Sequence, residues 1–341
     1  MPPEPSIAVI VIAHERAELL RRCLDSLRQQ TYRHFDVLVV LNGANEATTQ
    51  VAHEVAATEP RTRAISIAPV SASLARNQGV RQTDASVLYF LDDDVTAPDH
   101  VLAKLAELYT EHGDLAIVGG PNLTPPDDPP FAHLTGAVLG SPWGTGITHA
   151  RYVVHEQGPA RERDLILCNL AVARSVFDSG ISFPELFGGE ENVLAGWVEE
   201  RGMRMWYAPE LWVYHHRRTT MAGYVSQIYR YGWGRANAMV TSPNNAHPLY
   251  FLPVAFLAYL VTMPLLVLLD ARCALGLLPY GLGTLVASGA AAARARKARW
   301  FPGLLVLFPV THIAYASGLA WQLAGWWLGA LGRRVRSLLW A

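Results

Sequence analysis

The chain alternates short apolar runs with amphipathic stretches over its first two thirds. Ile7 to Ala13 is a continuous apolar run rich in β-branched residues, which predicts a buried strand. Glu18 to Gln29 follows, and its apolar residues recur at the spacing of one helix face. Together these two segments predict a strand followed by a helix.

The same alternation recurs as far as about residue 91. Further strands are expected at Asp36–Leu41, Ala64–Ile67 and Val87–Leu91, with helices over Ala44–Thr58 and Ser73–Gln82. Strands that alternate with helices indicate βαβ units, so we expect an α/β fold with a mainly parallel sheet. Ligands of such sheets bind beyond the carboxyl ends of the strands.

Three of the predicted strands end in polar clusters. These are His14-Glu15-Arg16, Asn42-Gly43 and Asp92-Asp93-Asp94. Because the carboxyl ends of parallel strands meet at one edge of a sheet, we expect the three clusters to converge on one crevice.

From about residue 249 the pattern changes to long apolar blocks. They cover Tyr250–Leu269, Ala274–Ala293 and Phe301–Leu331, lengths that suit helices crossing a bilayer core of roughly 30 Å. The alternative is a buried helical bundle in a soluble protein. The third block contains Pro309 and His312, so it could bend, re-enter or split, and the sequence leaves the number of spans open.

The basic residues beside these blocks indicate which side of a membrane each end would face. The basic loop from Arg294 to Arg299 favours the cytoplasmic side, which it would share with the amino-terminal domain if the first two blocks form a hairpin. A single third span would then place the basic tail, residues 332–341, on the opposite side, and the sequence does not resolve this conflict. The formal net charge of −1 argues against nucleic acid as a partner. The cysteines show no paired or metal-ligand spacing, which favours a reducing, cytoplasm-facing environment, and the first residues do not resemble a signal peptide.

The three consecutive aspartates carry the strongest chemical signal. One of them could cap a helix that begins near Pro98 while the others are solvated. Alternatively, Asp92 and Asp94, on alternate residues after a buried strand, could bind one Mg²⁺ or Mn²⁺ ion that bridges to phosphate oxygens. The sequence contains neither a P-loop nor a Gly-x-Gly-x-x-Gly motif that would hold a diphosphate in another way.

Several segments, in this order and spacing, resemble the inverting family 2 glycosyltransferases of the GT-A fold. They lie between Ile7 and about Trp233 and read VIVIAHER, DVLVVLNG, SLARNQGV, FLDDDV, LCNLAVARSVFDSGISF, FGGEEN and WYAPELWVYHH. Each segment is weak alone, but the combination is specific. The chain is most similar to the bacterial, membrane-attached exopolysaccharide or cell-wall type, in which membrane helices follow the catalytic domain.

The resemblance assigns expected roles to individual residues. Asp92 and Asp94 would contact the metal and the diphosphate, and Asp93 the sugar or ribose. The other residues expected to bind the nucleotide-sugar are His14, Glu15, Asn42, Arg76 and Asn77. The family commonly has Asp at the position of Asn42, so the preference for a UDP-sugar is less certain here.

The resemblance also points to a catalytic base in the EEN segment. The matching position is Glu191, although Glu190 remains a candidate because Glu is one methylene longer than the family's Asp. A simple acidic helix amino-terminus is the structural alternative. His215 could complete the metal shell or contact phosphate, or it could be an ordinary histidine at a strand end.

Two segments are candidates for the acceptor side. Gln227, Arg230 and Tyr231, in QIYRY, resemble the Q-x-x-R-W motif of processive members, whereas an amphipathic membrane anchor over 219–248 explains the same pattern. The Pro- and Gly-rich segment Pro121–Gly146 resembles an acceptor-side insert. The expected organisation is a catalytic domain over 1–218, the interface segment, a transmembrane region over 249–331 and the basic tail.

These inferences predict a metal-dependent glycosyltransferase at the cytoplasmic face of the inner membrane, with several membrane passes. Its donor would be a nucleoside-diphosphate sugar, with UDP favoured, and its acceptor a polyprenyl-linked or growing glycan. One alternative is a HAD-like phosphatase that uses the D-x-D-x-T pattern of Asp92, Asp94 and Thr96. The other is a non-catalytic membrane partner that only binds the nucleotide-sugar.

Overall fold

The structure is a computed structural model in which residues 4–339 are described, with side chains up to residue 328. The chain divides into two compact units. The first unit contains Met1–Asp128 and Ile147–Arg217, and the second contains Pro129–Gly146 and Arg218–Ala341. The expected boundary near residue 218 therefore coincides with the start of the second unit's main segment. However, residues 129–146, expected within the catalytic domain, belong to the second unit.

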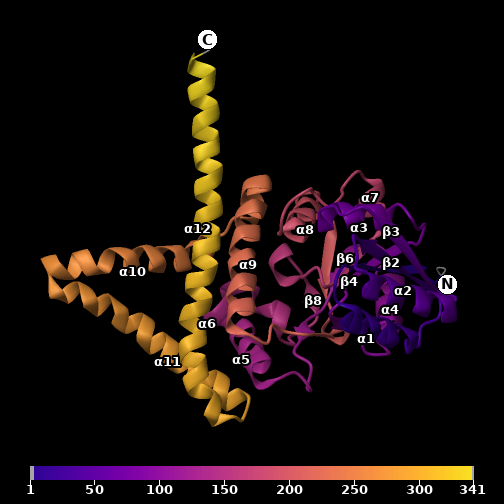
Figure 1. Cartoon of the computed structure of the whole chain (residues 1–341), viewed down its shortest axis with the longest axis horizontal. Helices are drawn as coiled ribbons and strands as arrows, with labels where there is room; N and C mark the ends of the chain where they lie inside the picture. Colours follow the sequence, from indigo (N-terminus) through magenta and orange to yellow (C-terminus); the bar gives the residue numbers. More distant parts are fainter. Residues whose placement is uncertain (1–3, 340–341) are drawn as a thin grey trace. The chain divides into compact units, whose positions relative to one another are not determined.

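The first unit is built around an eight-stranded sheet with the order β3-β2-β1-β4-β9-β6-β10-β8 (Figure 1). Its first half is parallel: β1 (Ile7–Ala13) pairs with β2 (Phe35–Asn42) and β4 (Val87–Asp92), and β2 pairs with β3 (Thr62–Ile67). The connecting helices are α1 (Ala17–Arg28), α2 (Glu46–Thr58) and α3 (Ala72–Val80). This half confirms the predicted βαβ order, because each strand is a β-rich apolar run followed by an amphipathic stretch.

The second half of the sheet is mixed. Strand β9 (Asn169–Ala173) runs antiparallel to both β4 and β6 (Leu115–Gly119), and β8 (Gly158–Pro159) runs antiparallel to β10 (Arg204–Tyr207). Only β6 and β10 are parallel in this half. The expectation of a mainly parallel sheet is therefore correct for β1–β4 and wrong for β9. The apolar run of β9 fits either direction, and only the path of the chain decides which it takes.

Three further strands form a small second sheet with the order β5-β11-β7. Strand β5 (Val95–Thr96) follows the aspartates directly and pairs antiparallel with β11 (Val213–His215). Strand β7 (Asn122–Leu123) pairs parallel with the other side of β11. This small sheet brings the segment WVYHH beside the end of β4, although they are more than a hundred residues apart in sequence.

Apolar side chains on both faces of the large sheet form the core of the first unit. Ile10, Val40 and Phe90 are almost completely buried, together with residues of the covering helices. These helices include α4 (Val101–Glu111), α7 (Arg174–Asp178) and α8 (Glu190–Glu200). Burial on both faces explains why the strands are continuous apolar runs rather than alternating ones.

The second unit is helical. Its elements are α5 (Pro130–Leu139), α6 (Pro142–Thr145), α9 (Met221–Thr241), α10 (Leu252–Leu269), α11 (Leu277–Arg294) and α12 (Phe301–Leu339). Three segments are long and apolar enough to cross a membrane: Pro248–Leu269, Ala271–Arg294 and Ala298–Leu328. They correspond to the three predicted blocks. The third is one continuous helix that includes Pro309, rather than a divided segment.

Helices α9 and α12 pack closely along each other, as Figure 1 shows. A Cβ atom on Gly232 would lie 2.1 Å from the carbonyl oxygen of Tyr315, and one on Gly318 would lie 2.0 Å from that of Tyr229. The two glycines therefore allow the helix backbones to touch, as small residues do at the interfaces of membrane helices. Whether α9 also lies at a membrane surface stays a prediction.

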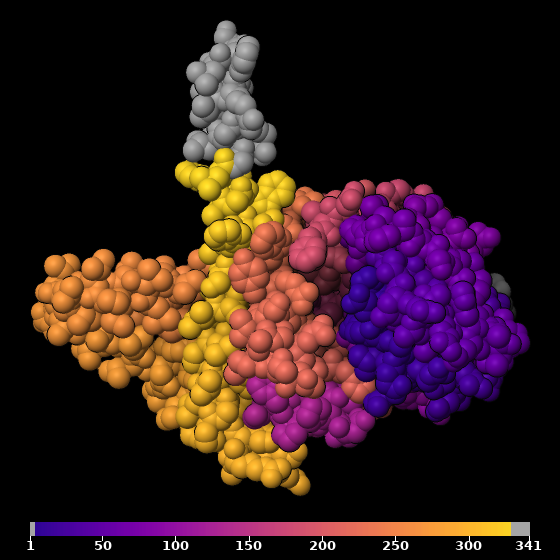
Figure 2. Space-filling view, viewed as in Figure 1, coloured from indigo at the N-terminus to yellow at the C-terminus, as the bar shows by residue number. Residues whose placement is uncertain are grey.

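Large apolar side chains on α10 and α11 face outward from the unit. Leu268 and Leu269 are 82% and 85% exposed, and the surface of α10 is open in Figure 2. Such exposure is unfavourable in water but is expected where lipid is the solvent. The arginines of the predicted basic tail lie outside the residues whose side chains are described.

Candidate functional site

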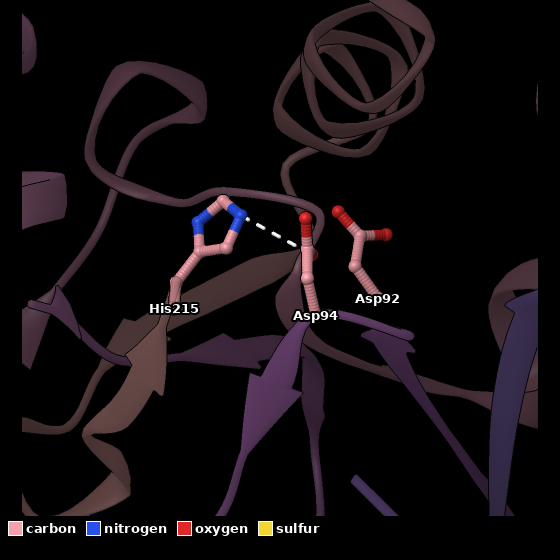
Figure 3. A group of neighbouring side chains, drawn as sticks. All are labelled: Asp92, Asp94 and His215. Carbon is pink, nitrogen blue, oxygen red and sulfur yellow. Dashed lines mark ion pairs between the residues drawn. The ribbon is translucent and has the colours of Figure 1, made fainter. Parts of the chain in front are cut away.

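The aspartates lie where the large and small sheets meet. Asp92 is the last residue of β4, Asp93 and Asp94 form the turn, and β5 begins at Val95. Because His215 pairs with Val95 in the small sheet, its ring lies beside Asp94, with 3.3 Å between Nε2 and Oδ1 (Figure 3). Asp94 and His215 are buried, whereas Asp92 is half-buried.

Asp92, Asp94 and His215 form a candidate metal centre. Each offers one ligand atom, and these atoms all lie within 4.8 Å of one another. Two carboxylates and an imidazole are donors that suit Mn²⁺ and related divalent ions. Burial lowers the pKa of His215, but the Asp94 carboxylate and Cys168 together outweigh it and raise that pKa to about 10. This reflects strong negative charge at the site, which a divalent cation would also balance.

A residue without an assigned role in the sequence analysis, Arg16, balances the aspartates directly. Its guanidinium pairs with the carboxylates of both Asp93 and Asp94. Burial raises the pKa of Asp93 to about 7, although Arg16 acts against that rise. The sequence contained a signal for this role, because Arg16 is the last residue of the first predicted polar cluster. The neighbouring carboxylates of Asp93 and Asp94 repel each other, and the Arg16 guanidinium offsets this repulsion.

A second arginine, Arg76, joins the aspartates to the EEN segment. Its Nη2 lies 3.2 Å from Oδ1 of Asp92, and its Nη1 lies 3.0 Å from Oε1 of Glu190. Arg76 and Glu190 are only 7% and 6% exposed. Burial raises the pKa of Glu190 to about 7, although Arg76 favours the ionised carboxylate. Arg76, which was expected to bind the nucleotide-sugar, therefore pairs with two acidic side chains.

The two candidate bases differ in their surroundings. Both lie in the first turn of α8, after Gly188 and Gly189, which have φ angles of 81° and 83°. Glycine tolerates such angles without strain, so these residues can form the sharp turn that leads into the helix. Glu190 is buried and paired with Arg76, whereas Glu191 is half-buried. Glu191 is therefore the more accessible of the two carboxylates.

The remaining predicted nucleotide-binding residues fall into two groups. His14 and Glu15 are exposed after β1, and Nδ1 of His14 lies 3.0 Å from the carbonyl oxygen of Asn42. The Asn42 side chain exchanges two hydrogen bonds with the backbone of Val70. Asn77 makes the same kind of pair with the backbone of Phe183. Both amides hold neighbouring loops in place, so their expected contact with a nucleotide stays a prediction.

Behind His215 lies a buried network absent from the sequence-based predictions. Sγ of Cys168 lies 3.8 Å from Nδ1 of His215, and Nδ2 of Asn122 donates a hydrogen bond to that sulfur at 3.2 Å. Arg217 in turn donates hydrogen bonds to Oδ1 and the carbonyl oxygen of Asn122, both at 2.7 Å. The network orients the imidazole. No local sequence pattern connects its residues, which lie on different strands and loops.

The predicted acceptor residues lie on α9 of the second unit. Gln227 and Tyr231 are half-buried and Arg230 is exposed. Arg235, further along the same helix, is 5% exposed, with its guanidinium 4.3 Å from the centre of the Tyr250 ring. The role of α9 as a membrane anchor stays a prediction.

Comparisons with known proteins match part of this chain to glycosyltransferases. Residues 8–162 match the family model described as glycosyl transferase family 2. This chain is 29% identical to glycosyltransferase GlyA of Streptococcus pneumoniae over 115 residues, which is 33% of its length. Over 97 residues, or 28% of the chain, it is 28% identical to the putative glycosyltransferase EpsH of Bacillus subtilis. The matches span only 16% and 28% of the lengths of these relatives.

A solved structure supports the fold. The mannosyltransferase PcManGT from Pyrobaculum calidifontis, in complex with GDP-Man and Mn²⁺, superposes with a TM-score of 0.60 at 19% identity. The alignment covers 94% of this chain and 88% of that one. The phosphatase alternative is not favoured, because Asp92 ends the fourth strand along the chain rather than the first. The matched segment and the relatives support a family 2 glycosyltransferase, and the solved structure shows a similar fold.

Proposed function

We propose that this chain is a metal-dependent, inverting glycosyltransferase that moves a sugar from a nucleoside-diphosphate sugar to a lipid-linked or growing glycan. The observation that carries the proposal is the arrangement of Asp92, Asp94 and His215 beside Arg76 and the EEN segment. It combines a candidate cation site with two candidate bases in the first turn of α8, within one network of charges.

The donor end of the site follows from the cation chemistry. Asp92, Asp94 and His215 would hold Mn²⁺ or Mg²⁺, which would neutralise charge on the leaving diphosphate. The complex of PcManGT with GDP-Man and Mn²⁺ supports this assignment by similarity of fold. Asn42 already bonds the backbone of Val70, so it gives no further support to uridine. The choice between UDP and GDP donors is therefore a question for the assay.

The acceptor end uses the carboxylate of Glu191. In the proposed reaction Glu191 takes the proton of the acceptor hydroxyl, and that oxygen attacks the anomeric carbon opposite the departing diphosphate. The bond from the anomeric carbon to the diphosphate oxygen breaks and its electron pair leaves with the diphosphate. Because the acceptor oxygen enters from the opposite face, the configuration inverts. Glu190 holds Arg76, which also contacts Asp92, and so acts as a positioning residue.

The apolar helices of the second unit support a membrane location. Three segments of sufficient length and hydropathy suggest attachment to a membrane, and we propose a multi-pass protein of the inner membrane. The basic loop from Arg294 to Arg299 favours the cytoplasmic side for its flanking residues. An enzyme attached in this way would find a lipid-linked acceptor in the same membrane and use it for polysaccharide or cell-envelope synthesis.

The test uses the purified full chain with UDP-, GDP- and dTDP-sugars, each with Mn²⁺, Mg²⁺ or EDTA. We expect release of nucleoside diphosphate from one donor class, dependent on the cation and lost in Asp94→Asn. The matched control is Asp99→Asn, an exposed aspartate away from the metal group. Metal-dependent donor binding without any turnover, even with lipid-linked acceptors, would favour the non-catalytic alternative. The absence of both binding and nucleoside diphosphate release, for every donor tested, would refute the transferase proposal.

A further inference from the structure

The second unit contains an apolar groove with one charged end. It lies between α6 and α11 and has a volume of about 550 Å³. Trp143, Leu282, Val286 and Ala290 line its length, and Arg294 lines it at the last residue of α11. Its volume lies within the range of pockets that take a single small ligand.

One wall of the groove is fixed in place by polar contacts. The Trp143 indole donates a hydrogen bond to Oγ1 of Thr284 at 3.2 Å. The backbone carbonyl oxygen of Trp143 lies 2.7 Å from Nε2 of His312. The other ring nitrogen of His312 lies 2.8 Å from the hydroxyl of Tyr280. A Cβ atom on Gly283 would lie 2.4 Å from the Trp143 ring, so the indole rests directly on the backbone of α11. These contacts hold the Trp143 wall of the groove against α11 and α12.

Among the described residues of the second unit, no ion pair joins Arg294 to an acidic side chain. In the sequence of the second unit the one acidic residue is Asp270. It lies at the other end of the second candidate span, where its Oδ2 is 2.9 Å from Nη2 of Arg272. By contrast, Arg294 is followed within five residues by Arg296, Lys297 and Arg299. Four cations in six residues concentrate positive charge at this end of α11, which favours an anion with more than one negative charge.

The position of Arg294 also fits a lipid headgroup. The candidate span that contains the groove ends at this residue, so in a bilayer crossed by this span the groove would lie at hydrocarbon depth and Arg294 at the level of the headgroups. Arginine binds phosphate through two parallel N–H donors, which makes it well suited to a terminal phosphate.

Together these features point to one ligand, and the inference rests on the proposed function because it names the class of its acceptor. We propose that the groove binds a single-chain lipid phosphate or diphosphate, with its chain along α11 and its phosphate at Arg294. The charge of the basic end favours a terminal phosphate over the single negative charge of a phosphodiester lipid. The limited volume favours one chain over two.

The test measures lipid binding to the full chain in detergent by native mass spectrometry. The probe is geranylgeranyl monophosphate, and the comparison ligands are geranylgeraniol, which lacks the phosphate, and the two-chain lipid phosphatidylglycerol. We expect the phosphate to bind at least about tenfold more tightly than either comparison ligand. Equal binding of the alcohol would refute the role of the basic end. Equal binding of phosphatidylglycerol would refute the single-chain assignment.

Two pairs of variants locate the site. Arg294→Gln should weaken binding of geranylgeranyl monophosphate about tenfold, whereas Arg272→Gln at the other end of the same span should leave it unchanged. Ala290→Phe should block the groove, whereas Ala293→Phe, also exposed on α11 but outside the lining, should not. Equal effects within either pair would overturn the assignment. Since this readout involves no donor, lipid binding can fail while donor turnover persists, and the reverse.

Discussion

Arg76 and Glu190 form a buried ion pair, with 3.0 Å between Nη1 and Oε1. The same guanidinium also reaches Asp92 at the end of β4. The Arg76 side chain therefore connects a carboxylate of the candidate metal site to the first turn of α8, where the proposed base lies. This connection separates the roles of the two neighbouring glutamates and makes them testable.

The two glutamates should affect different kinetic constants. Glu191→Gln removes the proposed base, so kcat should fall about 10²–10⁴-fold with donor affinity retained. Glu190→Gln weakens the hold on Arg76 and Asp92, so its main effect should be a higher KM for the donor. Steady-state kinetics and donor titration measure both quantities. A loss of kcat confined to Glu190→Gln would identify Glu190 as the base instead.

Stability should depend on the ionisation of Glu190. Its pKa rises from the usual 4.5 to about 7 in the folded chain because the carboxyl is buried. The folded state then binds more protons than the unfolded state in this window, so Glu190 makes the chain less stable as pH rises from about 4.5 to 7. Thermal melts in EDTA should show Glu190→Gln gaining stability relative to the parent between pH 5 and 8. A difference that does not change with pH would contradict the shifted pKa.

Arg16 should matter most when the divalent ion is removed. Arg16→Gln leaves Asp93 and Asp94 without their guanidinium partner, which should destabilise the chain in EDTA by roughly 1–2 kcal/mol. This is less than the ~3–5 kcal/mol of a fully buried pair, because Arg16 is partly exposed. Mn²⁺ should restore most of the loss. The control is Arg21→Gln, which removes a surface pair with Glu54, and a similar response in both variants would count against the proposed balance of charge.

Cys168 should tune metal affinity through His215. To bind a metal through Nε2, the imidazole must carry its proton on Nδ1, and Sγ of Cys168 is the neighbouring acceptor. Cys168→Ala should weaken Mn²⁺ binding about 10–100-fold, as losses of such outer contacts do. Cys168→Ser should retain part of it, since a hydroxyl also accepts. Calorimetric titration with Mn²⁺ measures the effect, and unchanged affinity in an alanine variant that remains folded would refute the positioning role.

The contact between α9 and α12 should be intolerant of a single methyl group. Gly318→Ala places a Cβ atom against the backbone of Tyr229 and should cost about 1–3 kcal/mol as overpacking. Gly325→Ala on the same helix meets nothing within 4 Å and should stabilise slightly, because alanine favours helices by about 1 kcal/mol over glycine. Thermal melts in detergent compare the two. Equal midpoints would show that the close contact is not maintained.

Local patterns in the sequence determined much of this protein. The strands β1 to β4, the helices between them and the three apolar blocks follow from the spacing of apolar residues, which depends only on near neighbours. The polar clusters at the strand ends also converged near one edge, because parallel strands place their carboxyl ends together. Asp92, Asp94 and His215 were predicted as metal ligands for this reason and from family resemblance, and the structure groups them.

Tertiary structure decided what depends on contacts distant in sequence. It set the direction of β9, placed residues 129–146 in the second unit, paired Arg16 with Asp93 and Asp94, and brought Cys168 behind His215. None of these has a local signal, because an apolar strand fits either direction and one Arg or Cys can face many partners. The energy of a buried charge or a close contact depends on which groups surround it, and only the folded chain determines those groups.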